Sequence, residues 1–154
     1  MNTEKAFSVD EAEESTGFLL WQVTNLWQRE IRAALEEFGL THSQFVLMAS
    51  ILWLTQQKQT ITQVLLSSHT KIDPMTTSTV LRTLQKKGLL QRQEHATDTR
   101  AKTVALTEAG VASILPAIKA IEKFDHAFFS KLGPDVKGLN VNLLALLKKN
   151  TDTI

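Results

Sequence analysis

Residues 72–110 constrain the fold most, because they combine a helix start, a helix stop, a basic hairpin and a second helix start. The Asp73 carboxylate is well placed to accept a hydrogen bond from an otherwise unpaired N–H at a helix N-terminus. Pro74 then occupies the first helical position, where its missing N–H costs nothing. Gly88 is typical of the residue that ends a helix. These signals predict a helix over residues 74–87.

Two short strands are expected after this helix. Residues 89–93 and 102–106 have the alternating pattern of half-buried strands, and a polar segment separates them. Thr107 is a good N-cap for a helix that begins at Glu108. The order helix, strand, hairpin, strand, helix is that of a winged helix. A short helix over about 60–68 and a turn at 70–72 would supply the first half of a helix-turn-helix.

The helix over 74–87 has one apolar and one polar face. Val80, Leu81 and Leu84 recur at helical spacing and are expected in the core, with Thr77 at the edge of that face. Short hydroxyl side chains on the other face would let the helix approach a DNA groove closely. The alternative is an ordinary solvated helix face. On this helix the candidate DNA contacts are Thr76, Thr77, Ser78, Thr79 and Arg82.

The segment 82–102 is basic. It holds six cations against two anions, a local excess of +4 in a chain whose net charge is +1. Such an excess attracts phosphate through counterion release, although a solvated charged hairpin would look the same. Next to a polar helix of groove size, we favour DNA binding. The further candidate contacts are Thr62, Arg92, His95, Arg100 and Lys102.

Composition indicates the class of protein. A chain of 154 residues with 43% hydrophobic residues is long enough for one domain with a real core. It has no cysteine, which excludes disulfides and thiolate metal sites. Residues 1–16 are polar and acidic, and the longest nearly apolar run, 45–54, is shorter than the roughly 20 residues that span a bilayer. We therefore expect a soluble, cytoplasmic protein that does not bind a membrane.

Helices with apolar stripes are predicted on both sides of the winged helix. They cover residues 18–38, after an interruption at Gly17, and 108–131 and 139–149, with a kink at Pro116. Since one winged helix contacts few bases, a two-fold dimer would add affinity and specificity. We predict a single domain, mainly α with a small β wing. Residues 1–38 and 108–154 would form the dimerisation region of a homodimer, and 41–106 the DNA-binding core.

Three segments resemble the MarR family of bacterial transcription regulators. They are GLTHSQFVLMASI at 39–51, IDPMTTSTVLRTLQKKGLL at 72–90 and DTRAKTVALTEAG at 98–110. The resemblance implies a dimeric winged helix-turn-helix that represses transcription until a small ligand or an oxidant releases it. It implies that helix 74–87 enters the major groove of double-stranded DNA, that Arg100 reaches the minor groove, and that Asp98 orients the wing. Without cysteine, ligand sensing is either by a small, non-thiol-reactive molecule or absent.

Other sites and functions are less well supported by the residues. Trp21, Trp27, Phe45 and Trp53 could line an aromatic ligand pocket, or they could be core or interface aromatics. The four histidines are scattered, so no metal site and no cofactor are expected. No nucleophile, base and orienting group occur together, so we do not expect an enzyme. The alternative function is a winged-helix protein-interaction module without specific DNA binding.

Overall fold

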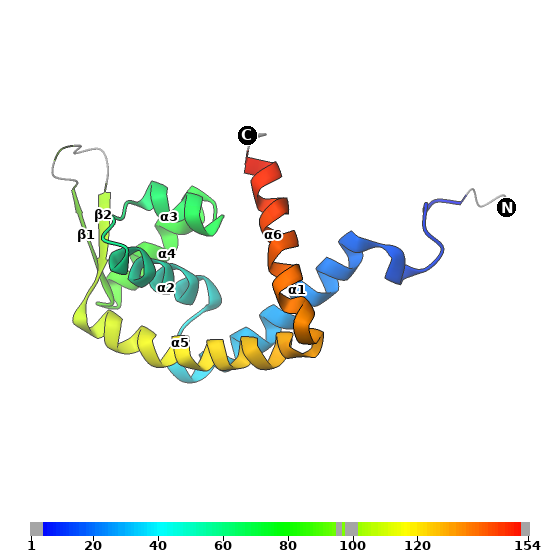
Figure 1. The fold of residues 1–154 in the computed structure, drawn as a ribbon. Coiled ribbons are helices and arrows are strands. Elements are labelled where there is room, and N and C mark those ends of the chain that lie inside the picture. The colour runs from blue at the N-terminus through cyan, green and yellow to red at the C-terminus, as the bar shows by residue number, and fades with distance from the viewer. Residues whose placement is uncertain (1–4, 95–96, 98–101, 152–154) are drawn as a thin grey trace.

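The structure is a computed structural model that describes residues 5–94, 97 and 102–151, and the side chains of these apart from 94 and 149–151. It is mainly helical, with one two-stranded antiparallel sheet (Figure 1). The α-helices are α1 (Thr16–Leu35), α2 (His42–Gln56), α3 (Gln63–Thr70), α4 (Pro74–Lys86), α5 (Glu108–Phe129) and α6 (Val136–Thr151). The strands are β1 (Leu90–Glu94) and β2 (Lys102–Leu106), and 3₁₀ segments cover Ala12–Glu14, Glu36–Phe38 and Ser130–Asp135.

Helix α1 begins earlier than the sequence predicts. The Ser15 side chain accepts a hydrogen bond from Phe18 N–H and caps the helix, and Gly17 lies inside its first turn. The expected interruption at Gly17 is therefore wrong, because a single glycine near a capped end costs too little to break a helix. At the other end, Gly39 has φ of +63° and ends the 3₁₀ segment that extends α1.

Local signals define the helix-turn-helix as expected. The reciprocal capping box of Thr41 and Gln44 starts α2, and the Thr62 hydroxyl caps α3. Asp73 caps α4 with Pro74 at its first position, and Gly88 follows it with φ of +73°. Lys71, between α3 and α4, also has a positive φ of 61°. The chain therefore reverses direction within three residues between α3 and α4.

The wing is a regular antiparallel hairpin. Leu90 pairs with Leu106 and Glu94 with Lys102 at the two ends of the register. Leu90 and Val104 are buried and attach the hairpin to the core. An isolated bridge between Thr62 and Thr103 links the start of α3 to the second strand. The wing is thus fixed to the same residues that begin the helix-turn-helix.

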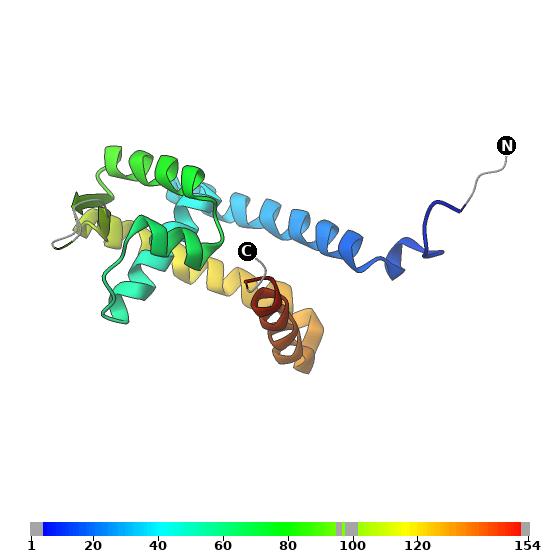
Figure 2. The same cartoon turned by 90° about the horizontal axis from the view of Figure 1, so that it is seen from above.

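The core is shared between the winged helix and the flanking helices. Ile31 and Leu35 of α1, and Ile114 of α5, are fully buried in the same cluster as Met48 of α2 and Leu81 of α4. The carboxy-terminal half of α1 and the amino-terminal half of α5 therefore belong to the core of the winged helix. We had expected them only to flank it. Figure 2 shows α1 and α5 leaving this core in the same direction.

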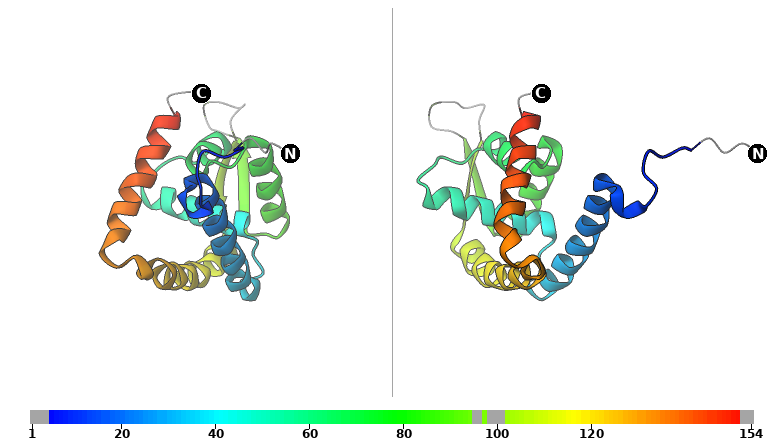
Figure 3. Two further views of the ribbon diagram at one scale, coloured as in Figure 1. Left: turned by 90° about the vertical axis from the view of Figure 1, so that its right-hand side faces the viewer. Right: turned by 45° about the vertical axis from the view of Figure 1, so that its right-hand side comes forward.

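Helix α6 stands apart from the winged helix. Gly133, with φ of 56° and ψ of −127°, breaks the chain before Pro134, as predicted, and α6 turns away from α5 (Figure 3). Its main contact is with the 3₁₀ segment that precedes it. Within the described residues, no single helix has the length and hydropathy to cross a bilayer. One pair of helices, α1 with its 3₁₀ extension and α2, has the required length and hydropathy when taken together, but the two are bent by 76° relative to each other.

Candidate nucleic-acid interface

The outer face of α4 is a polar surface on a firmly held helix. Thr76, Thr79, Arg82 and Thr83 are exposed, and Ser78 is half-buried. On the opposite face, Leu81 and Leu84 are fully buried. Among the described residues, the one hydrogen bond of the Arg82 side chain is a long one of 3.5 Å from Nε to Ser78 O on its own helix. Its guanidinium therefore has donors free for an external acceptor.

Thr77 corrects one of the sequence predictions. Its side chain is fully buried, and its hydroxyl donates to Ile72 O at 3.4 Å. It shares the apolar stripe because it lies four residues before Leu81 and seven before Leu84. A side chain in that position cannot reach a DNA surface, so Thr77 supports the helix and does not read DNA.

The start of α4 is held by the turn that precedes it. Asp73 Oδ1 accepts from Thr76 N–H at 2.8 Å. Hydrogen bonds from the side chain and backbone of Thr76 hold the pKa of the Asp73 carboxyl below its usual value. Ile72 O accepts from Ser67 Oγ on α3 at 2.7 Å. The helix end that would enter a groove is thus fixed by short bonds to both helices of the motif.

Arg92 of β1 connects its strand to two helices, α3 and α4. From β1 its Nε donates to Gln85 Oε1 on α4 at 2.8 Å, and its Nη1 donates to Gln63 Oε1 on α3 at 3.0 Å. The sequence treated Arg92 as a phosphate contact, but these bonds make it a link between the wing and the helix-turn-helix. No local pattern pointed to these two glutamines, because Gln63 and Gln85 lie 29 and 7 residues from Arg92, on other elements.

The remaining candidates divide into two groups. Lys102 is exposed at the start of β2, and Thr62 is half-buried, with its Oγ1 accepting from Leu65 N–H at 3.1 Å. His95, Asp98 and Arg100 lie outside the described residues. Thr62 and Lys102 therefore lie near each other, since Thr62 bridges to Thr103, and the exposed residues of α4 form a separate group.

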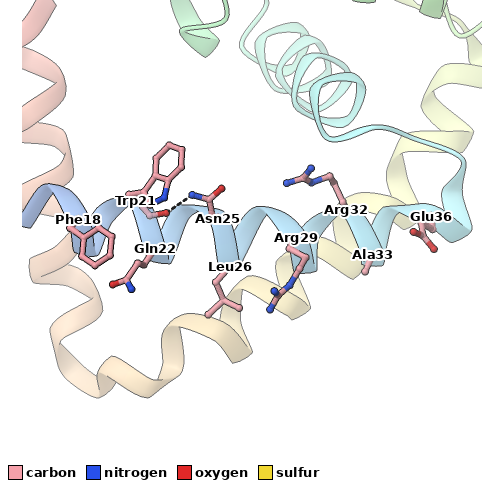
Figure 4. A pocket seen from close by; sticks show the side chains of 9 residues that line it. All are labelled: Phe18, Trp21, Gln22, Asn25, Leu26, Arg29, Arg32, Ala33 and Glu36. Atoms are coloured by element: carbon pink, nitrogen blue, oxygen red, sulfur yellow. Dashed lines mark hydrogen bonds between the residues drawn. The ribbon is translucent and has the colours of Figure 1, made fainter. Parts of the chain in front are cut away.

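Trp21, Phe45 and Trp53, three of the four aromatic residues considered for a ligand site, do not come together. Trp21 is 67% exposed on α1, where it lines a wide groove with Phe18, Asn25 and Arg32 (Figure 4). Phe45 packs partly buried against the core, and Trp53 is 58% exposed near the end of α2. None of four cavities found among the described residues is lined by two of them. They do not form the shared pocket that we had considered.

A different cavity, of about 480 Å³, lies between α1 and the winged core. Trp27 and Arg32 line it from α1, His42 from the start of α2, and Thr70 and Ile72 from the turn before α4. The sequence places Trp27 among the candidate ligand aromatics but does not predict this cavity, because its walls come from segments up to 45 residues apart. Nothing in the local pattern of Trp27 distinguishes it from the other tryptophans.

One hydrogen bond and one ring contact hold the Trp27 side chain at this cavity. Trp27 Nε1–H donates to Asp125 Oδ1 on α5 at 2.8 Å, and the Trp27 and His42 rings meet edge to face at 5.3 Å. Burial lowers the pKa of His42 from its usual 6.5, and the Arg32 charge lowers it further against the opposing effect of Asp125. His42 is therefore held towards its neutral form. The described residues contain no group of three or more potential metal ligands.

The arrangement of α2, α3, the Lys71 turn, α4 and the β1–β2 hairpin defines a winged helix-turn-helix protein, the class that includes many transcription regulators. Residues 36–122 match the family described as the ArnR1-like winged-helix domain. The chain belongs to the MarR family of winged helix-turn-helix transcriptional regulators, as the sequence predicts.

Three comparisons illustrate this relationship. The chain is 44% identical over 116 residues to the uncharacterized HTH-type transcriptional regulator YdcH of Bacillus subtilis, covering 75% of this chain and 79% of that protein. It resembles the S. aureus MepR–DNA complex with a TM-score of 0.78 and 21% identity, over 90% of this chain and 99% of MepR. It resembles Rhodococcus jostii CouR bound to p-coumaroyl-CoA with a TM-score of 0.76 and 20% identity, over 88% and 93% of the two chains.

Proposed function

We propose that this protein is a homodimeric repressor that binds a palindromic DNA operator in the cytoplasm and leaves it when a small molecule binds. The observation that carries this proposal is the outer face of α4. It presents three hydroxyls and one arginine on a helix that is anchored by buried Thr77, Leu81 and Leu84. Hydroxyls and arginine bond to base edges and phosphates at close approach.

The proposed DNA contacts are divided between the helix and the wing. Thr76, Ser78, Thr79 and Arg82 would contact the major groove from α4, and Thr62 and Lys102 would contact the flanking phosphates. His95 and Arg100 would extend from the wing, with Asp98 orienting Arg100. Arg92 would act indirectly, since its bonds to α3 and α4 hold the wing beside them. The solved structures of MepR with DNA, and of the transcriptional repressor CouR with a 23-mer duplex, support DNA binding by a protein of this fold.

The homodimer is supported by apolar side chains that the single chain leaves uncovered. On α1 the side chains of Phe18, Leu20 and Val23 are exposed. On α6 Val141 is 65% exposed and Leu144 is 54% exposed. Large apolar surfaces of this kind mark protein interfaces. Pairing them in a two-fold dimer would present two α4 helices to half-sites about 34 Å apart.

We propose the cavity beside Trp27 as the effector site. It combines an aromatic wall, the Arg32 cation and hydroxyls, as binding sites for small molecules do. An occupant would contact Thr70 and Ile72, and Ile72 precedes the N-cap of α4 directly. Because the chain has no cysteine, release by thiol oxidation is excluded, and a non-covalent ligand remains. CouR bound to p-coumaroyl-CoA shows a relative in fold with a small-molecule complex.

Selection of bound fragments from genomic DNA tests the proposal directly. The expected result is a set of sites with two inverted half-sites about 10 base pairs apart, or a multiple of that spacing. The affinity for such a site should fall steeply with salt, and sedimentation should give a dimer. An absence of DNA binding at every salt concentration would refute the proposal and favour the protein-interaction module.

A further inference from the structure

Lys87 makes two bonds that reach far along the chain. It is the C-cap of α4, and its Nζ donates to Gly39 O at 3.2 Å and to Gln44 Oε1 at 3.4 Å. These acceptors are 48 and 43 residues away in sequence. Two of the three N–H donors of the ammonium group are therefore engaged inside the protein.

Both acceptors belong to the joint between α1 and α2. Gly39 ends the 3₁₀ extension of α1 in a left-handed conformation, and the chain bends by 76° here. Gln44 is buried, and its side chain also accepts from Thr41 N–H at 3.1 Å in the capping box that starts α2. Lys87 thus connects the end of α4 to the point where the long flanking helix joins the winged core.

The neighbouring bonds fix the same corner. Lys87 N–H donates to Thr83 O at 3.0 Å, and Leu89 N–H donates to Leu84 O at 3.0 Å, which closes the end of α4. Thr107 Oγ1 donates to Gly88 O at 2.7 Å and ties this end to the start of α5. The carboxy-terminal end of α4 therefore meets the α1–α2 joint and α5 at one place, away from the Asp73 end.

We propose that Lys87 is a positioning residue, which sets the carboxy-terminal end of α4 against the α1–α2 joint and makes no DNA phosphate contact. The proposal rests on the DNA-binding function proposed above. This role differs from that of the other cations of segment 82–102, which the charge count treats together as attracting phosphate. The Lys87 ammonium group would also couple a movement of α1 to α4, because it extends from α4 and bonds to the α1–α2 joint.

The adjacent Lys86 supplies a matched control. It is exposed in the last turn of α4 and has no hydrogen bond or ion pair among the described residues. Lys87→Met removes the donors and keeps the aliphatic stem, Lys86→Met removes the same charge one residue away, and Lys87→Arg restores cationic donors. All three are made in the full chain, and circular dichroism and thermal unfolding establish the folded fraction.

The first measurement is the affinity of the folded protein for a fluorescein-labelled duplex that carries a genomically selected site, between about 50 and 200 mM salt. Lys87→Met is expected to weaken binding about threefold to tenfold, the scale of a lost hydrogen bond. The slope of log affinity against log salt should equal that of the wild type. Lys87→Arg should return to within about twofold.

A second measurement needs no DNA. Amide hydrogen exchange over residues 83–88 should be faster in Lys87→Met than in the wild type and unchanged in Lys86→Met. If the protein binds no DNA, the proposed function is overturned. The amide hydrogen exchange over residues 83–88 then tests by itself whether Lys87 holds the end of α4.

Three results would overturn the positioning role. The first is a salt slope that falls by about 0.9 per protomer in Lys87→Met, which would identify a phosphate contact. The second is an affinity equal to that of the wild type. The third is amide exchange that is unchanged or equally fast in the two methionine variants.

Discussion

The indole N–H of Trp27 on α1 donates to the Asp125 carboxylate on α5 across 2.8 Å, joining residues 98 positions apart in the chain. The bond crosses between the two helices that leave the winged core together, and the same indole meets the His42 ring at the start of α2. One side chain therefore connects both flanking helices to the first helix of the DNA-binding unit.

Replacing Trp27 by phenylalanine should destabilise the protein. The ring is kept, but the partly buried Asp125 carboxylate loses its donor, at a cost of about 1–3 kcal/mol. Urea unfolding at a fixed protein concentration measures the effect. Trp53→Phe is the control, because Trp53 is exposed on α2 and its replacement should change stability by less than about 0.5 kcal/mol. Equal losses in the two variants would contradict the structural role of the bond.

Gly110→Ala should be destabilising for a different reason. A Cβ at Gly110 would overlap the carbonyl oxygen of Leu89, which belongs to the backbone and cannot rotate away. The start of α5 would have to shift from the wing, at a cost of about 1–3 kcal/mol or more. Gly138→Ala, in open space on α6, should instead stabilise by about 0.5–1 kcal/mol. Thermal unfolding of both variants checks the opposite signs.

His42 should make stability depend on pH. Because its pKa is lowered from 6.5 in the folded protein, the unfolded chain binds the proton first as the pH falls. Stability is therefore greatest above pH 6.5 and declines as the pH falls below it, until the folded pKa is reached. His42→Gln should flatten the unfolding free energy in this window, whereas exposed His69→Gln should not. A parallel decline in wild type and His42→Gln would refute the assignment.

Arg82→Ala should weaken operator binding by about 1–3 kcal/mol, because the side chain is exposed and its one bond among the described residues is a long one. A titration at fixed salt measures the loss. Lys119→Ala, which removes an exposed cation on α5, is the control for charge alone. If both variants bound equally well, α4 would not be the reading surface.

Leu144→Glu should disrupt dimerisation, since it places a charge on the exposed apolar face of α6. Sedimentation over a range of concentrations should give a monomer, and removal of residues 139–154 should do the same. Val64→Glu is the control, because Val64 is also an exposed apolar residue but lies on α3, and this variant should remain a dimer. A dimeric Leu144→Glu protein would locate the interface elsewhere.

The sequence by itself determined the elements whose causes are local. The caps of α2 and α4 and the stop at Gly88 depend on bonds or dihedral angles within about four residues, so Thr41, Asp73 and Gly88 revealed them directly. The strand predicted over residues 102–106 has the same bounds as β2 in the structure, and the winged helix was predicted from the order of the elements. Thr77 shows the limit of this reasoning, because its spacing places it at the edge of the apolar face, and only the structure shows that it is fully buried with its hydroxyl bonded to Ile72 O.

Tertiary structure alone decided the contacts that join distant segments. Arg92 and Lys87 look like phosphate-binding cations in a basic stretch, but their acceptors come from α3 and from the α1–α2 joint, up to 48 residues away. The cavity beside Trp27 likewise needs α1, α2 and the turn before α4 to meet. A charge pattern records how many cations a segment has, but not which acceptors the fold brings to them.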